Sequence, residues 1–428
     1  MPDKEHRWMT AAAIALLPEW QQAIIAPERE RLVNEYCKYP DWYFDVDGGG
    51  HAKAAPYHFA TDGIQFHYLP DSSVVDKYRY WQIRDGELKR LGQGENLNWK
   101  HARNGFTFYF TQIVGNLRGK QWRDALAFAG CLLHVLQDAC FTLHSLEGPY
   151  GTDVFVLDRL FDHGDQMGKL PSNILAAAMP EAAATRPDHV PARLGNSVDE
   201  AVCRLYGRYV RTCLEARKLS FRIVQNVYEG RRDDQLHERM FHNAVKLCAD
   251  TLDTAFRLAA GEAADVENLP LTDLEPVDRF WGCPGPYRYV TMLRDKALSP
   301  RGEIVPLRLT LDGKPETFER GLSFGSHVEF CVAYELPRDV YRRLSCWIGL
   351  QAEFVDTGDV ALQLLNDGRE VFAAAFNQSR PAAQVEVDRP GGRLEIVGSS
   401  PAAARSKTVV AIAAPTLWGK QTSYVEVE

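Results

Sequence analysis

The sequence lacks several features that would place the protein at a membrane or on duplex nucleic acid. Its longest apolar runs, such as 125–133, are well short of the roughly 18 residues of a membrane span. The N-terminal MPDKEHRWM is charged and has no apolar stretch of the signal-peptide kind. Basic residues are not in excess, since 49 Lys+Arg face 57 Asp+Glu and the net charge is −8. We therefore expect no transmembrane segment and no general surface for duplex nucleic acid. A cytoplasmic location and the earlier removal of a leader are both compatible with this N-terminus.

Cysteine is also sparse, with nine residues in 428. Nine is an odd number, and no two of these cysteines form a CxxC motif. This argues against a disulfide framework, and thiol chemistry is not the leading hypothesis. The remaining composition, 45% hydrophobic and 25% charged, is that of an ordinary globular chain with two or three domains. Five of the cysteines lie in helical patterns and are predicted to be small buried core residues: Cys131, Cys140, Cys203, Cys213 and Cys248.

Two kinds of periodicity divide the chain. Up to about residue 260 the pattern is helical, interrupted at 41–96 by a Gly-, Pro- and aromatic-rich stretch that is predicted to be a long loop. From residue 304 onward short alternating runs such as IVPLRLTL and REVFAAAF are separated by Asp-Gly and Pro-Gly-Gly turns, as in an antiparallel β-sandwich. The predicted organisation is a helical domain at 1–262, a proline-containing linker at 263–302 and a β-sandwich at 303–428.

The stretch GCLLHVLQDACFTLHSLEG carries the clearest chemistry. His134 and Asp138 are four residues apart and share one face of the predicted helix. His144 would lie roughly 80° to the other side of His134 if the helix continued that far. Asp138 sits among apolar residues, where a carboxylate requires a cation, an arginine or a metal ion.

Further imidazoles and carboxylates occur in short segments elsewhere in the helical half. Oxygen and nitrogen ligands gathered from several segments are typical of a multi-zinc site. Taken singly, each also has a structural explanation, such as a helix start, a turn, aromatic packing or a solvent-facing charge. The set is His6, Asp41, His58, His67, Asp158 and Asp162, the last two forming an i, i+4 pair in VLDRLFD.

On these motifs the helical half resembles the zinc-dependent phospholipase C family, whose all-α fold is shared with single-strand-specific nucleases. His6-Arg-Trp-Met resembles the first helix of that family, PDW at Asp41 its aspartate ligand, and LLHVLQDACFTLH its His-x-x-x-Asp signature with a third histidine. VLDRLFD occupies the place of a His-x-x-x-Glu/Asp pair, with Asp158 instead of histidine. PYHFATD and FHYLPD both resemble the family's His-aromatic context, so His58 and His67 are both retained. The start of the chain lacks the tryptophan whose amino group is a ligand in the family.

The resemblance implies two or three zinc ions that activate water for hydrolysis of a phosphoric ester of a lipid or nucleotide. Asp138 is then expected to bridge two ions, and Asp41 to act as a ligand or as the base for the water, which makes these two the candidate catalytic residues. The implied metal ligands are His6, Asp41, His58, His67, His134, Asp138, His144, Asp158 and Asp162.

The C-terminal part resembles the NPCBM family of carbohydrate-binding modules, a galactose-binding-like jelly roll that usually accompanies glycoside-active enzymes. The resemblance is carried by LTLDGKPETFERGLSFGSHVEFCVAYEL and YRRLSCWIGL, in which Gly321, His327, Tyr334, Trp347 and Gly349 match the pattern. His327 and Trp347 also fit the core of a sandwich. Glycan binding is implied by this resemblance, and no particular sugar-binding residue is predicted.

Three functions follow from these observations. The main hypothesis is a zinc-dependent, phospholipase C-like phosphodiesterase with a glycan-binding module, secreted if it follows the family. The alternatives are a nuclease or nucleotidase on the same scaffold, and a glycan-binding protein whose metal site has degenerated. The net charge of −8 argues mildly against long nucleic acid as the substrate.

Overall fold

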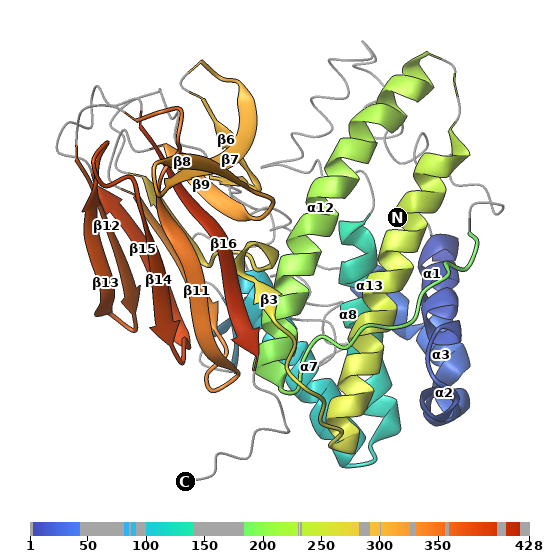
Figure 1. Ribbon diagram of the computed structural model, residues 1–428. Helices are drawn as coiled ribbons and strands as arrows, with labels where there is room; N and C mark the ends of the chain where they lie inside the picture. The colour runs from blue at the N-terminus through green and yellow to red at the C-terminus, as the bar shows by residue number, and fades with distance from the viewer. Residues whose placement is uncertain are drawn as a thin grey trace, which may run out of the picture. The chain divides into compact units, whose positions relative to one another are not determined.

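The computed structural model describes residues 3–42, 81–84, 87–90, 100–140, 184–229, 231, 233–281, 292–299, 301–325, 330–355, 359–399 and 408–419. The chain divides into two compact units, Met1–Ala263 and Ala264–Glu428. The first is built mainly of helices and the second of antiparallel strands (Figure 1). The predicted order of a helical region followed by a β-sandwich is therefore confirmed.

Long helices dominate the first unit, and their ends follow local sequence signals. Ser197 precedes a 31-residue helix, and its Oγ accepts a hydrogen bond from the Glu200 backbone N–H at 3.1 Å. Gly261 ends the last helix in the left-handed conformation, with φ of 73°. The helices are α1 (Asp3–Ala15), α2 (Glu19–Ile25), η1 (Ala26–Glu28), α3 (Arg29–Asn34), η2 (Tyr36–Lys38), α4 (Tyr39–Trp42), α7 (Lys100–Arg118), α8 (Trp122–Ala139), α12 (Val198–Tyr228) and α13 (Asp234–Ala260).

The stretch 41–96, predicted as a loop, contains regular structure at two places. The last residues of α4 reach Trp42, and β1 (Trp81–Arg84) pairs antiparallel with β2 (Glu87–Arg90). The sequence carries Asp-Gly between these strands, the composition that favours a two-residue hairpin connection. Each of these strands has only four residues, which is too short for an alternating pattern to be recognised in the surrounding polar and aromatic sequence.

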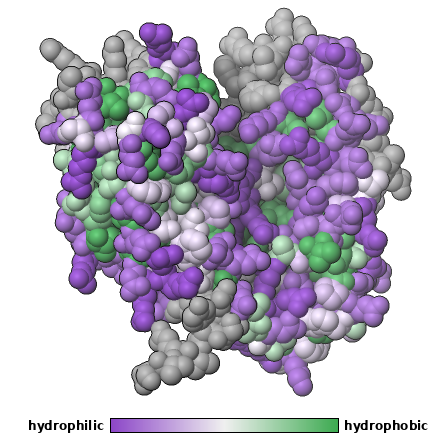
Figure 2. All heavy atoms as spheres, viewed as in Figure 1, coloured by the Kyte–Doolittle hydropathy of each residue, from purple (hydrophilic) through white to green (hydrophobic). Residues whose placement is uncertain are grey.

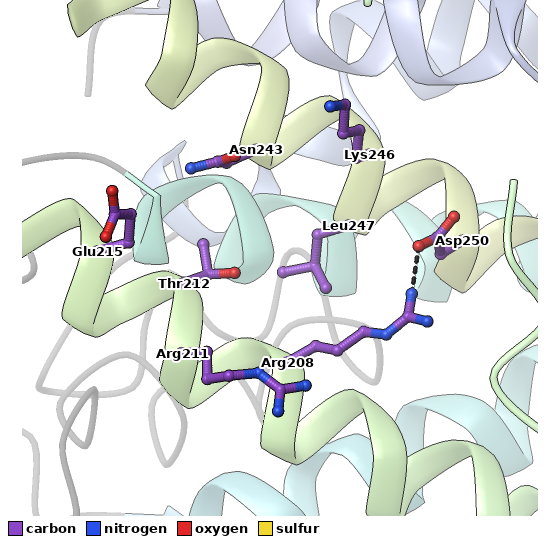
Figure 3. A pocket seen from close by; sticks show the side chains of 8 residues that line it. All are labelled: Arg208, Arg211, Thr212, Glu215, Asn243, Lys246, Leu247 and Asp250. Atoms are coloured by element: carbon purple, nitrogen blue, oxygen red, sulfur yellow. Dashed lines mark hydrogen bonds and ion pairs between the residues drawn. The ribbon is translucent and has the colours of Figure 1, made fainter. Parts of the chain in front are cut away.

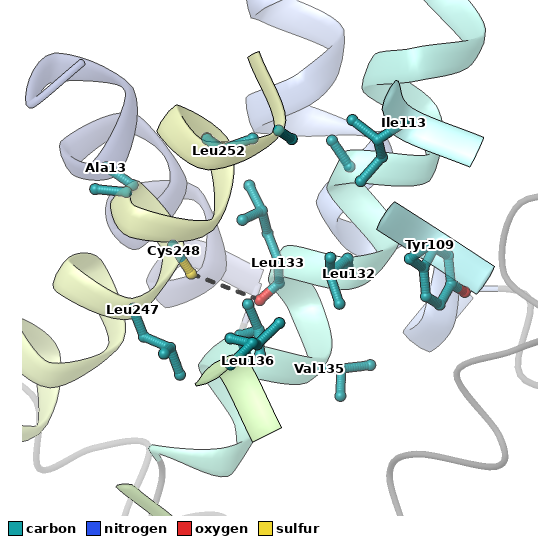
Figure 4. Close-up of a cluster of buried hydrophobic side chains, with 14 of the residues drawn as sticks. Ala13, Tyr109, Ile113, Leu132, Leu133, Val135, Leu136, Leu247, Cys248 and Leu252 are labelled. Atoms are coloured by element: carbon teal, nitrogen blue, oxygen red, sulfur yellow. Dashed lines mark hydrogen bonds between the residues drawn. The ribbon is translucent and has the colours of Figure 1, made fainter. Parts of the chain in front are cut away.

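Helix α8 lies at the centre of the helical unit. Every residue from Ala125 to Ala139 is buried, and α1, α7, α12 and α13 all contact this helix. Leucines of α8 pack against Leu252 and Cys248 of α13, and the Cys248 thiol lies 3.9 Å from the backbone oxygen of Leu133 (Figure 4). The five cysteines predicted to be core residues are buried, and none of them forms a disulfide with a described residue.

The second unit is an antiparallel β-sandwich. One sheet has the order β13-β12-β15-β10-β4 and another the order β14-β11-β16-β9-β5 with β3 beside β16, while β6, β7 and β8 form a third. The strands are β3 (Leu269–Pro270), β4 (Asp278–Trp281), β5 (Leu293–Arg294), β6 (Lys296–Leu298), β7 (Ile304–Leu311), β8 (Lys314–Phe318), β9 (Gly321–Gly325), β10 (Phe330–Leu336), β11 (Tyr341–Leu350), β12 (Val360–Asn366), β13 (Arg369–Phe376), β14 (Ala382–Asp388), β15 (Gly392–Ser399) and β16 (Val409–Gly419).

Two Asp-Gly pairs form the hairpin turns that their sequence predicts. At 312–313 φ is 47° and 76°, and at 367–368 it is 50° and 75°, so both residues of each pair are left-handed. The segment 263–302, expected to be a linker, instead contributes β3, β4, β5 and β6 to the sheets of the second unit. Strands of two to four residues are too short to show a two-residue period in the sequence.

The surface has the character expected from the composition. On the face seen in Figure 2, hydrophilic side chains predominate over the described part of both units, and apolar residues form small separate groups. Among the described helices, none combines the length and the hydropathy needed to cross a membrane.

We predict that Gly130→Ala destabilises the helical unit. A Cβ at this position of α8 would lie 2.5 Å from Cβ of Tyr36 and 2.9 Å from the backbone N of Cys37, so α8 and η2 would have to separate. Overpacking of this kind costs about 1–3 kcal/mol of unfolding free energy, which chemical denaturation measures.

Gly115→Ala on α7 is the matched control, because a Cβ there has no neighbour within 4 Å. It is expected to raise the unfolding free energy by about 0.5–1 kcal/mol through helix propensity. Equal effects of the two variants would contradict the close packing of α8 on η2.

Candidate functional site

Two histidines and one aspartate meet inside the helical unit. His6 comes from α1, and His134 and Asp138 come from successive turns of α8, so the predicted shared face is present. Their exposed fractions are 0%, 0% and 1%. The Asp138 carboxylate lies 3.4 Å from Nε2 of His6 and 3.1 Å from Nε2 of His134. One nitrogen or oxygen from each residue lies within 4.8 Å of the others.

The orientation of both imidazole rings is set by hydrogen bonds on their other nitrogen. Nδ1 of His134 donates to the backbone oxygen of Cys37 at 2.8 Å, since a carbonyl oxygen can only accept. Nδ1 of His6 lies 2.6 Å from Oε1 of Gln137, which likewise is an acceptor. With the proton on Nδ1, a neutral ring presents the lone pair of Nε2, and in both residues this atom faces Asp138.

The cluster therefore has the chemistry of a cation site. Two imidazole lone pairs and a carboxylate point at one another in a buried volume, which is unfavourable unless a proton or a metal ion lies between them. The rings of His6 and His134 are stacked with centroids 4.1 Å apart, so protonating both would place two positive charges face to face. Nitrogen and oxygen donors of this type, with Nδ1 held by a carbonyl, fit zinc.

Several residues that support the cluster were missed in the sequence. Gln137 connects α8 to α1 a second time, because its Nε2 donates to the Thr10 hydroxyl at 2.9 Å. Burial raises the pKa of Glu5, beside His6, to about 7 despite the opposing effect of nearby lysines. Burial also raises the pKa of Tyr209 well above its usual value, with Asp138 among the smaller contributions. The signal available in the sequence was the helical spacing of Thr10, four residues after His6, and of Gln137, three residues after His134.

The structure describes little of the other predicted ligands. The backbone of Asp41 lies in α4, which contacts α8, but its side chain is outside the described part of the structure. The remaining five candidates lie outside the described residues, so their relation to the cluster stays a prediction: His58, His67, His144, Asp158 and Asp162.

Residues that match the carbohydrate-module pattern serve the packing of the sandwich where they are described. A Cβ at Gly321 would lie 2.5 Å from the backbone oxygen of Ile412, and one at Gly349 would lie 2.2 Å from that of Pro381. Tyr334 is buried, and Trp347 packs against the apolar cluster of the β7–β16 region. His327 lies outside the described residues.

Comparison with known proteins identifies the second unit. Residues 271–401 match the family model of the NPCBM/NEW2 domain. This confirms the predicted carbohydrate-binding-module type of β-sandwich for the C-terminal part of the chain. No curated protein matches the chain.

Solved structures with similarity to the chain contain modules of the CBM51 type. They include the M60 catalytic domain with two CBM51 domains of Clostridium perfringens ZmpB, at 21% identity and a TM-score of 0.31, covering 36% of this chain and 15% of that one. CBM51 from Clostridium perfringens GH95 in complex with methyl-galactose has 17% identity and a TM-score of 0.29, covering 35% and 99%. Tandem CBM51 modules of Sp3GH98 from Streptococcus pneumoniae have 20% identity and a TM-score of 0.31, covering 36% and 47%. The phospholipase C resemblance of the helical unit stays a prediction.

We predict that Gln137→Met lowers the free energy of unfolding by about 1–3 kcal/mol, the cost of leaving a buried donor without its acceptor. The thioether keeps the volume of the side chain but offers His6 Nδ1 only a weak acceptor. Gln112→Met on α7 is the control, because that side chain is partly exposed, and it should change stability by less than about 0.5 kcal/mol. Similar losses in both variants would show that Gln137 does not hold His6.

Proposed function

We propose that the protein binds a glycan through its C-terminal unit. The observation that carries this proposal is the match of residues 271–401 to the NPCBM/NEW2 domain. The antiparallel sandwich gives such a module a rigid frame, because its strands pair with their neighbours over most of their length. Connections between strands are then free to differ in sequence and to carry the sugar-binding side chains.

The test is retention of the full chain on an array of glycans ending in galactose, N-acetylglucosamine or other sugars. We expect retention on at least one terminal sugar, with competition by the free monosaccharide. A metal chelator and the variant His134→Ala should leave retention unchanged, because that histidine belongs to the helical unit. A chain that folds normally and is retained by no glycan would contradict the proposal.

We further propose that the helical unit is a zinc-dependent hydrolase of phosphoric esters. Support comes from the convergence of His6, His134 and Asp138, whose Nε2 and carboxylate atoms would hold a metal ion. Bound zinc supplies a Lewis acid that lowers the pKa of water toward about 7. Gln137 and the backbone oxygen of Cys37 keep both rings in the orientation that this requires.

The burial of the cluster has a further consequence for such chemistry. His6, His134 and Asp138 are almost fully buried, so solvent would screen a charge on a phosphoryl oxygen at the cluster only weakly, and that charge would interact strongly with its surroundings. Asp41, His58, His67, His144, Asp158 and Asp162 are the proposed further ligands, with Asp41 and Asp138 the proposed catalytic carboxylates. A nuclease or nucleotidase would use the same ligands and differ in the substrate.

We expect zinc to copurify with the protein and to be lost in His134→Ala and Asp138→Asn. Removing one ligand should lower zinc affinity by at least about tenfold, as measured with a competing chromophoric chelator. His242→Ala is the control, because this histidine of α13 bonds to Thr185 and lies outside the cluster.

Activity is tested on a panel of a phosphocholine ester, nucleotides and single-stranded nucleic acid, with zinc and with chelator. Hydrolysis should require metal and disappear in Asp138→Asn, because an amide offers one neutral oxygen where the carboxylate offers two anionic ones. Turnover that ignores the chelator would contradict the zinc mechanism. Absence of both metal and turnover would favour a glycan-binding protein with a degenerate metal site.

A further inference from the structure

A second polar feature of the helical unit lies apart from the histidine cluster, in a pocket of about 290 Å³ between α12 and α13. Each helix contributes residues at positions i, i+3, i+4 and i+7: 208, 211, 212 and 215 on α12, and 243, 246, 247 and 250 on α13. Such a stripe is usually apolar where two helices pack. Here Leu247 is its single apolar member, so the helices face each other across polar side chains (Figure 3).

The two carboxylates of the pocket are already neutralised. Asp250 accepts hydrogen bonds from Nε2 of His189 and from the backbone N–H of Ala192, both at 2.7 Å, and it pairs with Arg208, which reaches across from α12 (Figure 3). Glu215 pairs with Arg239. Among the described residues, these two carboxylates therefore pair with arginines and neither pairs with Lys246.

Three further lining groups are available to a ligand. Within the part of the chain that the structure describes, the ammonium of Lys246, the hydroxyl of Thr212 and the amide of Asn243 form no hydrogen bond or ion pair. All three residues are partly exposed, so their polar atoms remain hydrated and can exchange water for a ligand. Cations together with hydroxyl and amide donors are the groups that bind tetrahedral oxyanions.

We propose that this pocket binds a small oxyanion, phosphate or sulfate, either free or as the ester of a small molecule. Its volume is at the lower limit of ligand pockets and exceeds the need of the ion itself, which leaves space for an ester substituent. Arg208 contributes a fixed positive charge because Asp250 holds it in place, while Lys246 and Thr212 supply donors that are not otherwise engaged. This inference does not rest on the function proposed for either unit.

The experiment is calorimetric titration of the full chain with inorganic phosphate, inorganic sulfate and glycerol 3-phosphate. A chelator is present throughout, so that metal at the histidine cluster does not contribute. We expect binding that Lys246→Met weakens about tenfold and Thr212→Val weakens about threefold, through loss of one charge-assisted and one neutral hydrogen bond. Binding of glycerol 3-phosphate alone would identify an ester as the ligand, and equal binding of inorganic phosphate would identify the ion.

Arg123→Met is the matched control, because this arginine is exposed on α8 and does not line the pocket. It should bind like the unchanged protein, and thermal melts of every variant verify that each is folded. Equal weakening in Arg123→Met and Lys246→Met would show non-specific attraction to the surface and overturn the proposal. Absence of binding by all three probes would overturn it as well.

Discussion

The burial of helix α8 is the constraint on which the helical unit depends. Its fifteen consecutive residues from Ala125 to Ala139 are shielded on all sides, so any polar group among them must find a partner within the protein. The imidazole of His134 donates to the Cys37 backbone oxygen in η2, and the amide of Gln137 bonds to His6 and Thr10 in α1. The carboxylate of Asp138 lies against Nε2 of both histidines. The polar core thereby connects α8 to the chain's first helix and to the segment around Cys37.

The same constraint fixes the orientation of the two imidazole rings and therefore which nitrogen of each ring faces Asp138. A ring whose Nδ1 donates to a buried carbonyl oxygen cannot rotate without leaving that oxygen unsatisfied, at a cost of about 1–3 kcal/mol. Nε2 of His6 and of His134 is therefore held against Asp138 whether or not an ion is bound. Gly130 also helps to orient His134. Because glycine has no Cβ, η2 can pack closely against α8, and the Cys37 carbonyl then reaches His134.

The packing of α12 on α13 follows a different principle. Apart from Leu247, the facing residues of the stripe between 208 and 215 and between 243 and 250 are polar, and two ion pairs, Arg208–Asp250 and Arg239–Glu215, join the two helices there. Deeper in the unit the same two helices contribute Tyr209, Cys213, Cys248 and Leu252 to the common core. One face of each helix thus provides stability, and the neighbouring face is left available for a ligand.

The sequence by itself determined the two-part organisation, the long helices and the main strands, because these depend on periodicity and on local signals such as Ser197, Gly261 and the Asp-Gly turns. It also placed His134 and Asp138 on one face, since their spacing within one helix is enough to do so. The phospholipase C resemblance implied that His6 belongs with them, and the fold brings its Nε2 to Asp138. Tertiary structure alone decided that Gln137 and the Cys37 carbonyl orient the rings, and that 263–302 belongs to the sandwich. It alone brought the polar stripes of α12 and α13 together. These features depend on contacts between residues far apart in the chain, such as His6 and Gln137 at 131 positions, which no local pattern encodes.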